Sequence, residues 1–341
     1  MSTLSTTNPT LLDVARYLDP QGNIAKIALI LMKYNTILED MPSIEGNLPT
    51  GHQTNVETSK PTPTLRLVNQ GVVPAKATAK AIVDGLAMLE NRNSIDINVA
   101  KLNGNVESFR QRQSRSFIQG FMDELSRILV YGDVSTDSRE FNGLAARYFA
   151  LSGQTTSTNM ITAGGSGSDN TSIYLVKWGE DTTFTVYPKG SQAGMQFEDL
   201  GIQDVVTDAT TGAVMRAYTS WFQWLCGLVV ADWRSVVRIC NIDKSDLITA
   251  SDTSDTSANI LKFMSQAYDL LPPGQNGKPV FYMNNTVLSM LRVKLLVKGN
   301  MCLSFKDVMS PASDIARKDL YFYDIPCKRV DSILNTEATI S

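Results

Sequence analysis

The residues that most often carry enzyme chemistry are scarce in this sequence and poorly spaced for it. The single histidine, His52, lies in residues 48–54, whose proline, glycine and threonine content predicts an exposed loop. A Ser-His-Asp or Cys-His site needs a base held by packed neighbours, and histidine-bound zinc usually needs more than one imidazole, so both kinds of site are disfavoured. The four cysteines include no C-x-x-C pair and are predicted to be buried thiols: Cys226, Cys240, Cys302 and Cys327.

Two glycine-rich stretches resemble catalytic motifs without completing them. Residues 164–168 read Gly-Gly-Ser-Gly-Ser, which lacks the last glycine of a nucleophile elbow, and they predict a flexible connection. Residues 272–279 contain the Gly-Lys pair of a phosphate loop, but Pro279 stands where a Ser or Thr would bind the metal, so a turn between a helix and a strand is predicted. We therefore predict no catalytic, cofactor-binding or metal-binding residue, although an enzyme that uses carboxylates distant in sequence stays open.

The composition predicts a folded, soluble protein. The chain has 341 residues, of which 43% are hydrophobic and 19% charged, so it can bury a core and form two or three compact units. With 31 Lys and Arg against 34 Asp and Glu, the chain as a whole lacks the basic surface of a nucleic-acid-binding domain. The N-terminus has no secretory signal pattern, and the longest charge-free apolar cluster, residues 221–231, is shorter than the roughly 20 residues of a membrane helix. No membrane partner is expected.

The first 80 residues predict segments with little core of their own. Helical spacing at residues 11–18 and 24–38 predicts two helices that form an arm rather than the start of a large core. Residues 42–80 contain five prolines, and the alternation at residues 64–68 predicts one side of a long hairpin. Such a segment buries little surface within its own chain, so we expect it to lie on other subunits; a disordered loop is the alternative.

The strongest helix prediction covers residues 105–131, between an asparagine cap and Gly132. It would be about 40 Å long. Its second half is apolar along one side, whereas its first half is polar nearly all round, which suits a helix that leaves the core and touches neighbouring molecules. The predicted subunit contacts on this helix and on the extended segment are Glu57, Lys60, Arg66, Arg110, Arg112 and Arg115. For the three arginines of the helix, a solvated face is the alternative.

Beyond Gly132 the pattern changes to short strands and turns, which predicts a mixed α+β region. Residues 173–178 and 183–187 predict a hairpin. Two long strands are expected at residues 213–224 and 227–239 and two helices near 257–271 and 285–297. Shorter strands are expected at residues 280–283, 320–323 and 328–333.

Several stretches, taken together and in order, resemble the major capsid proteins of tailed double-stranded DNA phages, most of all the short-tailed phages of the epsilon-fifteen type. The resemblance implies the Johnson (HK-ninety-seven-like) fold of phage capsids. It maps an N-terminal arm to residues 1–41, an extended loop to 42–80, a peripheral domain with the spine helix to 81–135, and an axial domain with the rest of the peripheral domain to 136–341. The stretches that carry it are residues 141–148, 172–179, 186–191, 198–201 and 227–243.

The resemblance implies a structural protein and not an enzyme. Copies of the chain would form the hexamers and pentamers of an icosahedral shell in the virion, assembled in the host cytoplasm, which encloses packaged DNA without sequence-specific binding. Portal, scaffolding and cement proteins are further possible partners. Some shells of this family mature through lysine–asparagine bonds; Lys60 and Lys76 lie in or near the loop, but no motif identifies an acceptor, so noncovalent assembly is predicted. The alternatives are an encapsulin-like nanocompartment and a soluble α+β enzyme that uses distributed carboxylates.

Overall fold

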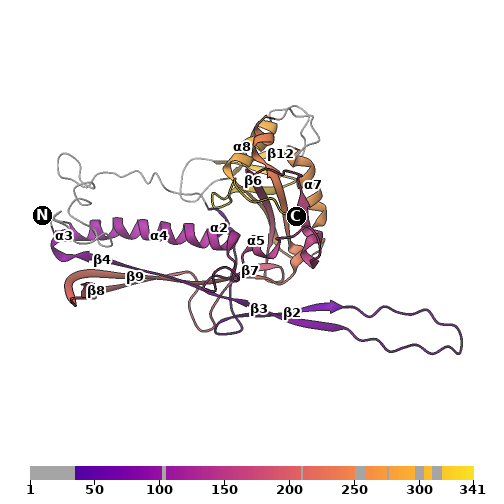
Figure 1. The fold of residues 1–341 in the computed structure, drawn as a ribbon, viewed down its shortest axis with the longest axis horizontal. Helices are drawn as coiled ribbons and strands as arrows, with labels where there is room; N and C mark the ends of the chain where they lie inside the picture. The colour runs from indigo at the N-terminus through magenta and orange to yellow at the C-terminus, as the bar shows by residue number, and fades with distance from the viewer. Residues whose placement is uncertain are drawn as a thin grey trace. The chain divides into compact units, whose positions relative to one another are not determined.

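The computed structural model describes residues 35–101, 105–208, 210–249, 259–274, 276–295, 303–308 and 317–341 (Figure 1). These residues form two compact units. The larger unit comprises the described parts of residues 35–87, 127–193 and 226–341, and the smaller unit those of 88–126 and 194–225. The helix predicted at residues 11–18 and most of the one at 24–38 lie outside the described residues, and within them the second ends in the short helix α2 (Ile37–Asp40).

A mixed sheet forms the core of the larger unit. Its main path runs β12–β13–β14–β11–β6–β7–β9, with β10 antiparallel to β6, β5 parallel to β10 and β1 parallel to β7. This mixture of parallel and antiparallel neighbours confirms the α+β prediction. The strands are β1 (Ser43–Glu45), β5 (Met160–Thr162), β6 (Asn170–Trp178), β7 (Thr183–Tyr187), β9 (Ala213–Val230), β10 (Val236–Asp243), β11 (Lys278–Met283), β12 (Leu303–Val308), β13 (Arg317–Phe322) and β14 (Ile325–Arg329).

Helices cover one face of this sheet. Strand β6 is buried along its whole length because it lies between β10 and β11 and both of its faces are covered. The apolar sides of α7 (Ile260–Leu270) and α8 (Asn285–Leu295), drawn in orange in Figure 1, pack on this sheet together with α6 (Lys244–Thr249). The helices predicted near residues 257–271 and 285–297 are thereby confirmed within the described residues.

Two strand predictions are wrong in how the strands connect. The segments 173–178 and 183–187 form β6 and β7 but no hairpin: they meet only at Trp178 and Thr183, in parallel, because β10 and β11 occupy both edges of β6. The break predicted at residues 225–226 does not exist, since β9 continues to Val230. The chain turns later, in the 3-10 helix η2 (Trp233–Ser235), where the carboxylate of Asp232 accepts a hydrogen bond from the backbone N–H of Arg234.

The two glycine-rich stretches are connections. Residues 164–168 link β5 to β6, but Gly165 is packed against β10 rather than loose: its N–H donates to the carbonyl of Asn241 at 2.8 Å, and a Cβ there would lie 2.6 Å from that oxygen. The described part of residues 272–279 joins α7 to β11, which confirms the predicted turn.

The smaller unit contains three strands, most of helix α4 (Val106–Tyr131) and the short α3 (Ile97–Lys101). Its strands follow the order β8 (Met195–Asp208), β9 and β4 (Ala87–Asp96). Helix α4 confirms the strongest helix prediction: the side chain of Asn105 accepts the Ser108 N–H at 3.1 Å and caps its start.

The prediction that α4 leaves the core in its first half is wrong. Phe109 is buried in a small apolar cluster with Ile95 and Ala100, so this half of the helix also packs within its own chain. Further along the helix, Phe117 stacks on Phe222 of β9 with 5.6 Å between ring centroids.

Candidate assembly surface

The larger unit carries an extended, exposed hairpin. Strands β2 (Gly51–Ser59) and β3 (Thr78–Gly85) pair in antiparallel register from Gly51–Gly85 to Ser59–Thr78 and form a separate two-stranded sheet (Figure 1). The sequence predicted a hairpin but placed one of its strands at residues 64–68, which is wrong. Those residues lie in the connection between the strands, where Pro61 and Pro63 have no N–H to donate to a ladder.

A buried ion pair fixes the base of this hairpin. Arg147, at the end of α5 (Leu144–Arg147), donates from Nη2 to Asp84 Oδ1 at 2.8 Å and to the carbonyl of Leu228 at 2.9 Å. Its Nε donates to the carbonyl of Asn142 at 3.0 Å. The Asp84 side chain is 6% exposed and that of Arg147 is 17% exposed. Arg147 therefore ties a strand of the hairpin to both α5 and β9.

Two residues that the sequence placed in a loop also belong to this base. A Cβ at Gly51 would lie 2.3 Å from the carbonyl oxygen of Asp84, so the two strands can approach here only because residue 51 is glycine. His52 lies in β2, which corrects the prediction of a loop, and its ring meets the Phe184 ring edge-on at 5.4 Å between centroids. This packing contact accounts for the place of His52 in the fold without a catalytic role.

Residues 60–77, hereafter the connection, present apolar side chains that touch little of their own chain. Leu65 is 103% exposed and Val68 is 91% exposed, and Leu67, Val72 and Val73 are exposed as well. The tip is nevertheless ordered by a turn: the Gln70 N–H donates to the Leu67 carbonyl at 3.1 Å, and the Leu67 N–H donates to Gln70 Oε1 at 3.0 Å. Asn69 supplies the left-handed conformation (φ 68°) that this turn requires.

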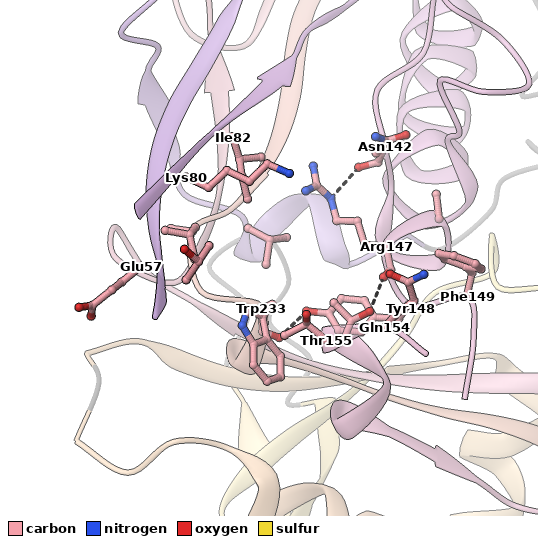
Figure 2. Close-up of a pocket in the computed structure, with 16 residues that line it drawn as sticks. Glu57, Lys80, Ile82, Asn142, Arg147, Tyr148, Phe149, Gln154, Thr155 and Trp233 are labelled. Carbon is pink, nitrogen blue, oxygen red and sulfur yellow. Dashed lines mark hydrogen bonds between the residues drawn. The ribbon is translucent and has the colours of Figure 1, made fainter. Parts of the chain in front are cut away.

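A groove lies beside the hairpin, within the same unit (Figure 2). Its cavity volume is about 640 Å³, which is within the usual range for binding clefts. In Figure 2, Lys80 and Ile82 of β3 face Arg147 and Phe149 across it. Much of the wall is apolar, and Phe149 is 56% exposed. The apolar lining includes Val56, Ile82, Ala146, Phe149, Val230 and Trp233.

A turn that carries Asp133 is hydrogen-bonded to one groove residue. The backbone N–H of Val134 donates to the side chain of Asn142, a groove residue, at 3.1 Å. Next to it, the carboxylate of Asp133 accepts hydrogen bonds from the N–H and hydroxyl of Ser135 (2.8 and 2.7 Å) and from the hydroxyl of Thr136. The Ser135 hydrogen bonds hold the pKa of Asp133 below its usual value, so the side chain is negatively charged at neutral pH.

The structure divides the six predicted contact residues between the two units. Glu57, Lys60 and Arg66 are exposed in the hairpin and connection, and Arg66 Nη1 donates to the carbonyl of Gln70 at 3.2 Å. Arg110, Arg112 and Arg115 lie on α4 in the smaller unit.

Of the three arginines, Arg110 already has partners in its own chain. Its Nη2 lies 2.5 Å from Asp199 Oδ1 and 3.2 Å from the hydroxyl of Ser220, and its guanidinium lies 5.2 Å from the Tyr218 ring centroid. The hydrogen bond from Arg110 lowers the pKa of Asp199. Arg112 is half-buried and Arg115 is exposed, which leaves Arg115 the most accessible of the three.

A second buried charged cluster, which the sequence did not predict, holds the C-terminal segment. The carboxylate of Glu337 accepts hydrogen bonds from Arg238 Nη2 at 2.9 Å, from the Tyr131 hydroxyl at 2.5 Å and from the Ser172 hydroxyl. Burial, together with nearby Tyr174 and Glu337, raises the pKa of Tyr131 far above its usual value. This cluster joins the C-terminal segment to β6, β10 and α4. Because its charges are paired and the Tyr131 phenol stays protonated, it offers no free base.

The remaining reactive groups are also unsuited to catalysis. Cys226, Cys240 and Cys327 are buried free thiols, as predicted, and Cys302 lies outside the described residues. Burial raises the pKa of Cys226 to about 12 and that of Cys240 to about 11, so neither is a thiolate at neutral pH. Among the described residues, no group of three His, Cys, Asp or Glu side chains is placed to hold a metal ion. In the same residues, no helix has the length and apolar character needed to cross a bilayer.

Comparison with known proteins gives matches to a family model and to solved structures. The family model described as major capsid protein GP7 matches residues 19–341. A near-atomic structure of bacteriophage Epsilon15 has 31% sequence identity and a TM-score of 0.77, and the match covers 100% of this chain and 99% of that one. No match is found among curated proteins.

The distant matches have low identity. The capsid of bacteriophage JBD30 is 9% identical with a TM-score of 0.45, covering 89% of this chain and 92% of that one. The SrpI encapsulin of Synechococcus elongatus PCC 7942 is 11% identical with a TM-score of 0.47, covering 72% of this chain and 99% of that one.

Proposed function

Because this chain belongs to the family of the major capsid protein GP7, we propose that its copies form the hexamers and pentamers of an icosahedral phage head enclosing packaged double-stranded DNA. Family membership itself makes the chain a structural subunit of a phage capsid, with the α+β Johnson fold, and a component of the virion. It also excludes the soluble enzyme that the sequence left open. The encapsulin-like compartment has no observation on this chain in its favour, since the encapsulin match is distant.

The exposed connection is the single observation that best supports assembly. Fully exposed leucine and valine side chains cost free energy in water, and burial of one such side chain is worth about 1.5–3 kcal/mol. An ordered turn that presents them outward is a feature of a surface that another molecule covers. In a shell made of one kind of subunit, that other molecule is a further copy of the chain.

Repeated contacts between different surfaces of identical subunits explain how such a shell closes. When one surface of a subunit meets a different surface of the next, the rotation between them decides whether a ring closes. Each subunit is then held by several neighbours at once, so modest individual contacts give a stable particle. In this assignment, residues 1–41 are the arm, residues 42–80 are the extended loop, and α4 is the spine helix within the peripheral domain of residues 81–135.

The charge of the chain fits a container for DNA. Its formal charge of −3 gives no general attraction to phosphate groups, so DNA can be enclosed without being bound by sequence. We place assembly in the host cytoplasm, with portal, scaffolding and cement proteins as further partners. The candidate contacts of the connection and hairpin, Glu57, Lys60 and Arg66, and the exposed Arg115 of α4 remain proposed contacts between subunits.

Electron microscopy of the purified chain, expressed without other phage proteins, tests this function. The proposal predicts closed shells tens of nanometres wide or, at minimum, rings of five and six subunits. Sedimentation of the same sample should show particles far heavier than one subunit. A chain that remains a monomer at all concentrations, with or without a scaffolding protein, would contradict the proposal.

A further inference from the structure

Two carboxylates meet where the glycine-rich link between β5 and β6 packs on the start of α6. The backbone N–H of Ser245 donates to both of them, to Asp243 Oδ1 at 2.9 Å and to Asp169 Oδ2 at 3.2 Å. Their other oxygens flank Gly167, because a Cβ there would lie 2.8 Å from Asp169 Oδ1 and 3.4 Å from Asp243 Oδ2. The two carboxylates therefore share one donor and face one glycine.

Neither carboxylate forms an ion pair within the described residues. The further donors to Asp243 are uncharged, namely the Ser245 hydroxyl at 2.7 Å and the Asp246 N–H at 3.1 Å. The Ser245 hydrogen bonds hold the pKa of Asp243 below its usual value, so this side chain is negatively charged at neutral pH. Both carboxylates are half-buried, where neighbouring like charges repel each other and a cation from the solvent relieves that repulsion.

A buried oxygen without a partner lies beside this pair. The Asn170 side chain is fully buried, and its Nδ2 donates to the Gly167 carbonyl at 2.8 Å and to the Thr339 hydroxyl at 3.1 Å. These acceptors fix the orientation of the amide and leave Asn170 Oδ1 buried with no hydrogen-bond donor in the described chain. A buried acceptor in this state destabilises the fold unless a bound ligand meets it.

The strand register puts this oxygen on the side of the Asp243 carboxylate. Asn170 lies directly opposite Asp243 in the β6–β10 ladder, and the side chains of opposite residues project to the same side of a sheet. The Cβ position of Gly165 lies 2.7 Å from Asn170 Oδ1 and 3.0 Å from the backbone nitrogen of Asp243. Asp169 directly precedes Asn170 in the chain. The amide oxygen and the two carboxylates thus border one loop, residues 164–170.

The glycines of this loop keep the space beside these oxygens free of side-chain atoms. Any other residue at position 165 would place its Cβ 2.7 Å from Asn170 Oδ1, and one at position 167 would place it 2.8 Å from Asp169 Oδ1. Gly164 has a φ of 88°, which also favours glycine. The glycine-rich sequence that completes no catalytic motif is therefore required for the close approach of oxygens to the backbone.

We propose that this loop binds a calcium ion, with Asp169, Asp243 and the amide oxygen of Asn170 as protein ligands and water at the remaining positions. Ca²⁺ takes about six to eight oxygen ligands in flexible geometry, from carboxylates, amides and water. Zn²⁺ prefers nitrogen and sulfur ligands, and Mg²⁺ keeps several of its waters and demands stricter geometry. With only two carboxylates, the expected Kd is about 10⁻⁵ to 10⁻³ M.

The ion would hold three parts of the larger unit together. Asp169 and Asn170 lie at the start of β6, Asp243 lies at the junction of β10 and α6, and Thr339 of the C-terminal segment is hydrogen-bonded to Asn170. A ligand that binds the folded state stabilises it by mass action, so calcium should stabilise the subunit. The inference goes beyond the capsid function and replaces the prediction from the sequence that no residue binds a metal.

Calcium titration of dissociated, full-length subunits tests the site. After removal of metals with EDTA and dialysis, isothermal titration calorimetry with CaCl₂ should show one ion bound per subunit. Calcium at about 10 mM should raise the urea unfolding midpoint by roughly 0.5 M or more. MgCl₂ at the same concentration and NaCl at the same ionic strength should raise it much less. Absence of calcium binding, or equal stabilisation by Mg²⁺, would overturn the inference and leave the capsid function intact.

Matched variants locate the ion. Asp169→Asn removes a ligand charge, and Asp181→Asn removes an exposed carboxylate from the link between β6 and β7 as a control. Asp169→Asn should weaken calcium binding about tenfold or more, and Asp181→Asn should bind as the wild type does. Asp243→Asn, which keeps an oxygen to cap α6, should also weaken binding.

Stability without calcium separates a lost ligand from a damaged fold. In EDTA, Asp169→Asn should be at least as stable as the wild type, because it removes a repulsion between like charges. In calcium it should be the less stable of the two. Equal calcium affinity in the wild type and in the variants at positions 169 and 243 would contradict the site.

Discussion

Replacement of Arg147 by methionine should destabilise the larger unit strongly, because it leaves Asp84 buried without its cation. Arg147 donates to Asp84 at 2.8 Å and to the carbonyls of Leu228 and Asn142, so Arg147→Met also removes donors from two backbone oxygens. Breaking a buried ion pair by removing one partner costs about 3–5 kcal/mol. With a urea dependence of about 3 kcal/mol per molar, the unfolding midpoint of dissociated subunits should fall by roughly 1–2 M.

The exposed pair Arg139–Asp137 provides the control, since its ions lie 2.7 Å apart but the Arg139 side chain is 87% exposed. Arg139→Met should give no measurable shift of the midpoint, because water already solvates both ions. The double variant Arg147→Met with Asp84→Leu should recover much of the loss, because no unpaired charge is then buried. Equal midpoints for Arg147→Met and Arg139→Met would refute the assignment of the buried pair as the anchor of the hairpin.

Three further outcomes are expected. Arg110 lowers the pKa of Asp199 below 3.8, so their pair stabilises the fold above that pH, and this contribution is lost as the pH falls through the lowered pKa. In acid unfolding between about pH 4 and pH 2, the variant Asp199→Asn should therefore lose less stability than the wild type. Identical unfolding curves for the two proteins would contradict this. Cys226 and Cys240 should resist iodoacetamide at pH 8 in the folded subunit and react after denaturation, because burial raises their pKa. Peptide mass spectrometry would measure the labelling, and rapid labelling of the native chain would contradict this prediction. Boiled, purified shells should run as intact monomers on a denaturing gel, since we predict noncovalent assembly, and a ladder of linked subunits would disprove it.

Local signals predicted the long helix well. Asn105 caps its start and Gly132 follows its end, where a Cβ would lie 2.5 Å from the Ile128 carbonyl. Because both signals act through neighbours in the chain, they can be read without knowledge of the rest of the fold. The burial of Phe109 could not be read in this way, since its partner Ile95 lies on a separate strand.

Strand pairing depends on contacts that the local pattern does not contain. Residues 173–187 have the composition of a hairpin, yet β6 takes β10 and β11 as neighbours because its fully buried sequence requires partners on both edges. The base of the extended hairpin is held by the close approach of Gly51 to Asp84 and by the Arg147–Asp84 pair, whose members are distant in sequence. Composition alone was enough to predict that residues 42–80 are extended and need cover from other subunits.

The buried cluster around Glu337 shows the same limit at the candidate site. Arg238, Tyr131 and Ser172 come from three different elements and meet only in the folded chain. A lone glutamate near the C-terminus gives no sign of such a role. By contrast, Glu57, Lys60 and Arg66 were chosen from a core-poor segment alone, and the structure leaves them exposed, although Arg66 lies in the connection and not in the strand predicted at residues 64–68. Their contact with other subunits stays a prediction.

Limited trypsin digestion at the connection tests the central claim most directly, namely that copies of the chain cover this segment. The bonds after Arg66 and Lys76 lie in an exposed, irregular segment and should be cut rapidly in dissociated subunits. In assembled shells the same bonds should be protected, and protection should be lost when the shells are dissociated. Equal cleavage rates in shells and in free subunits would contradict the account.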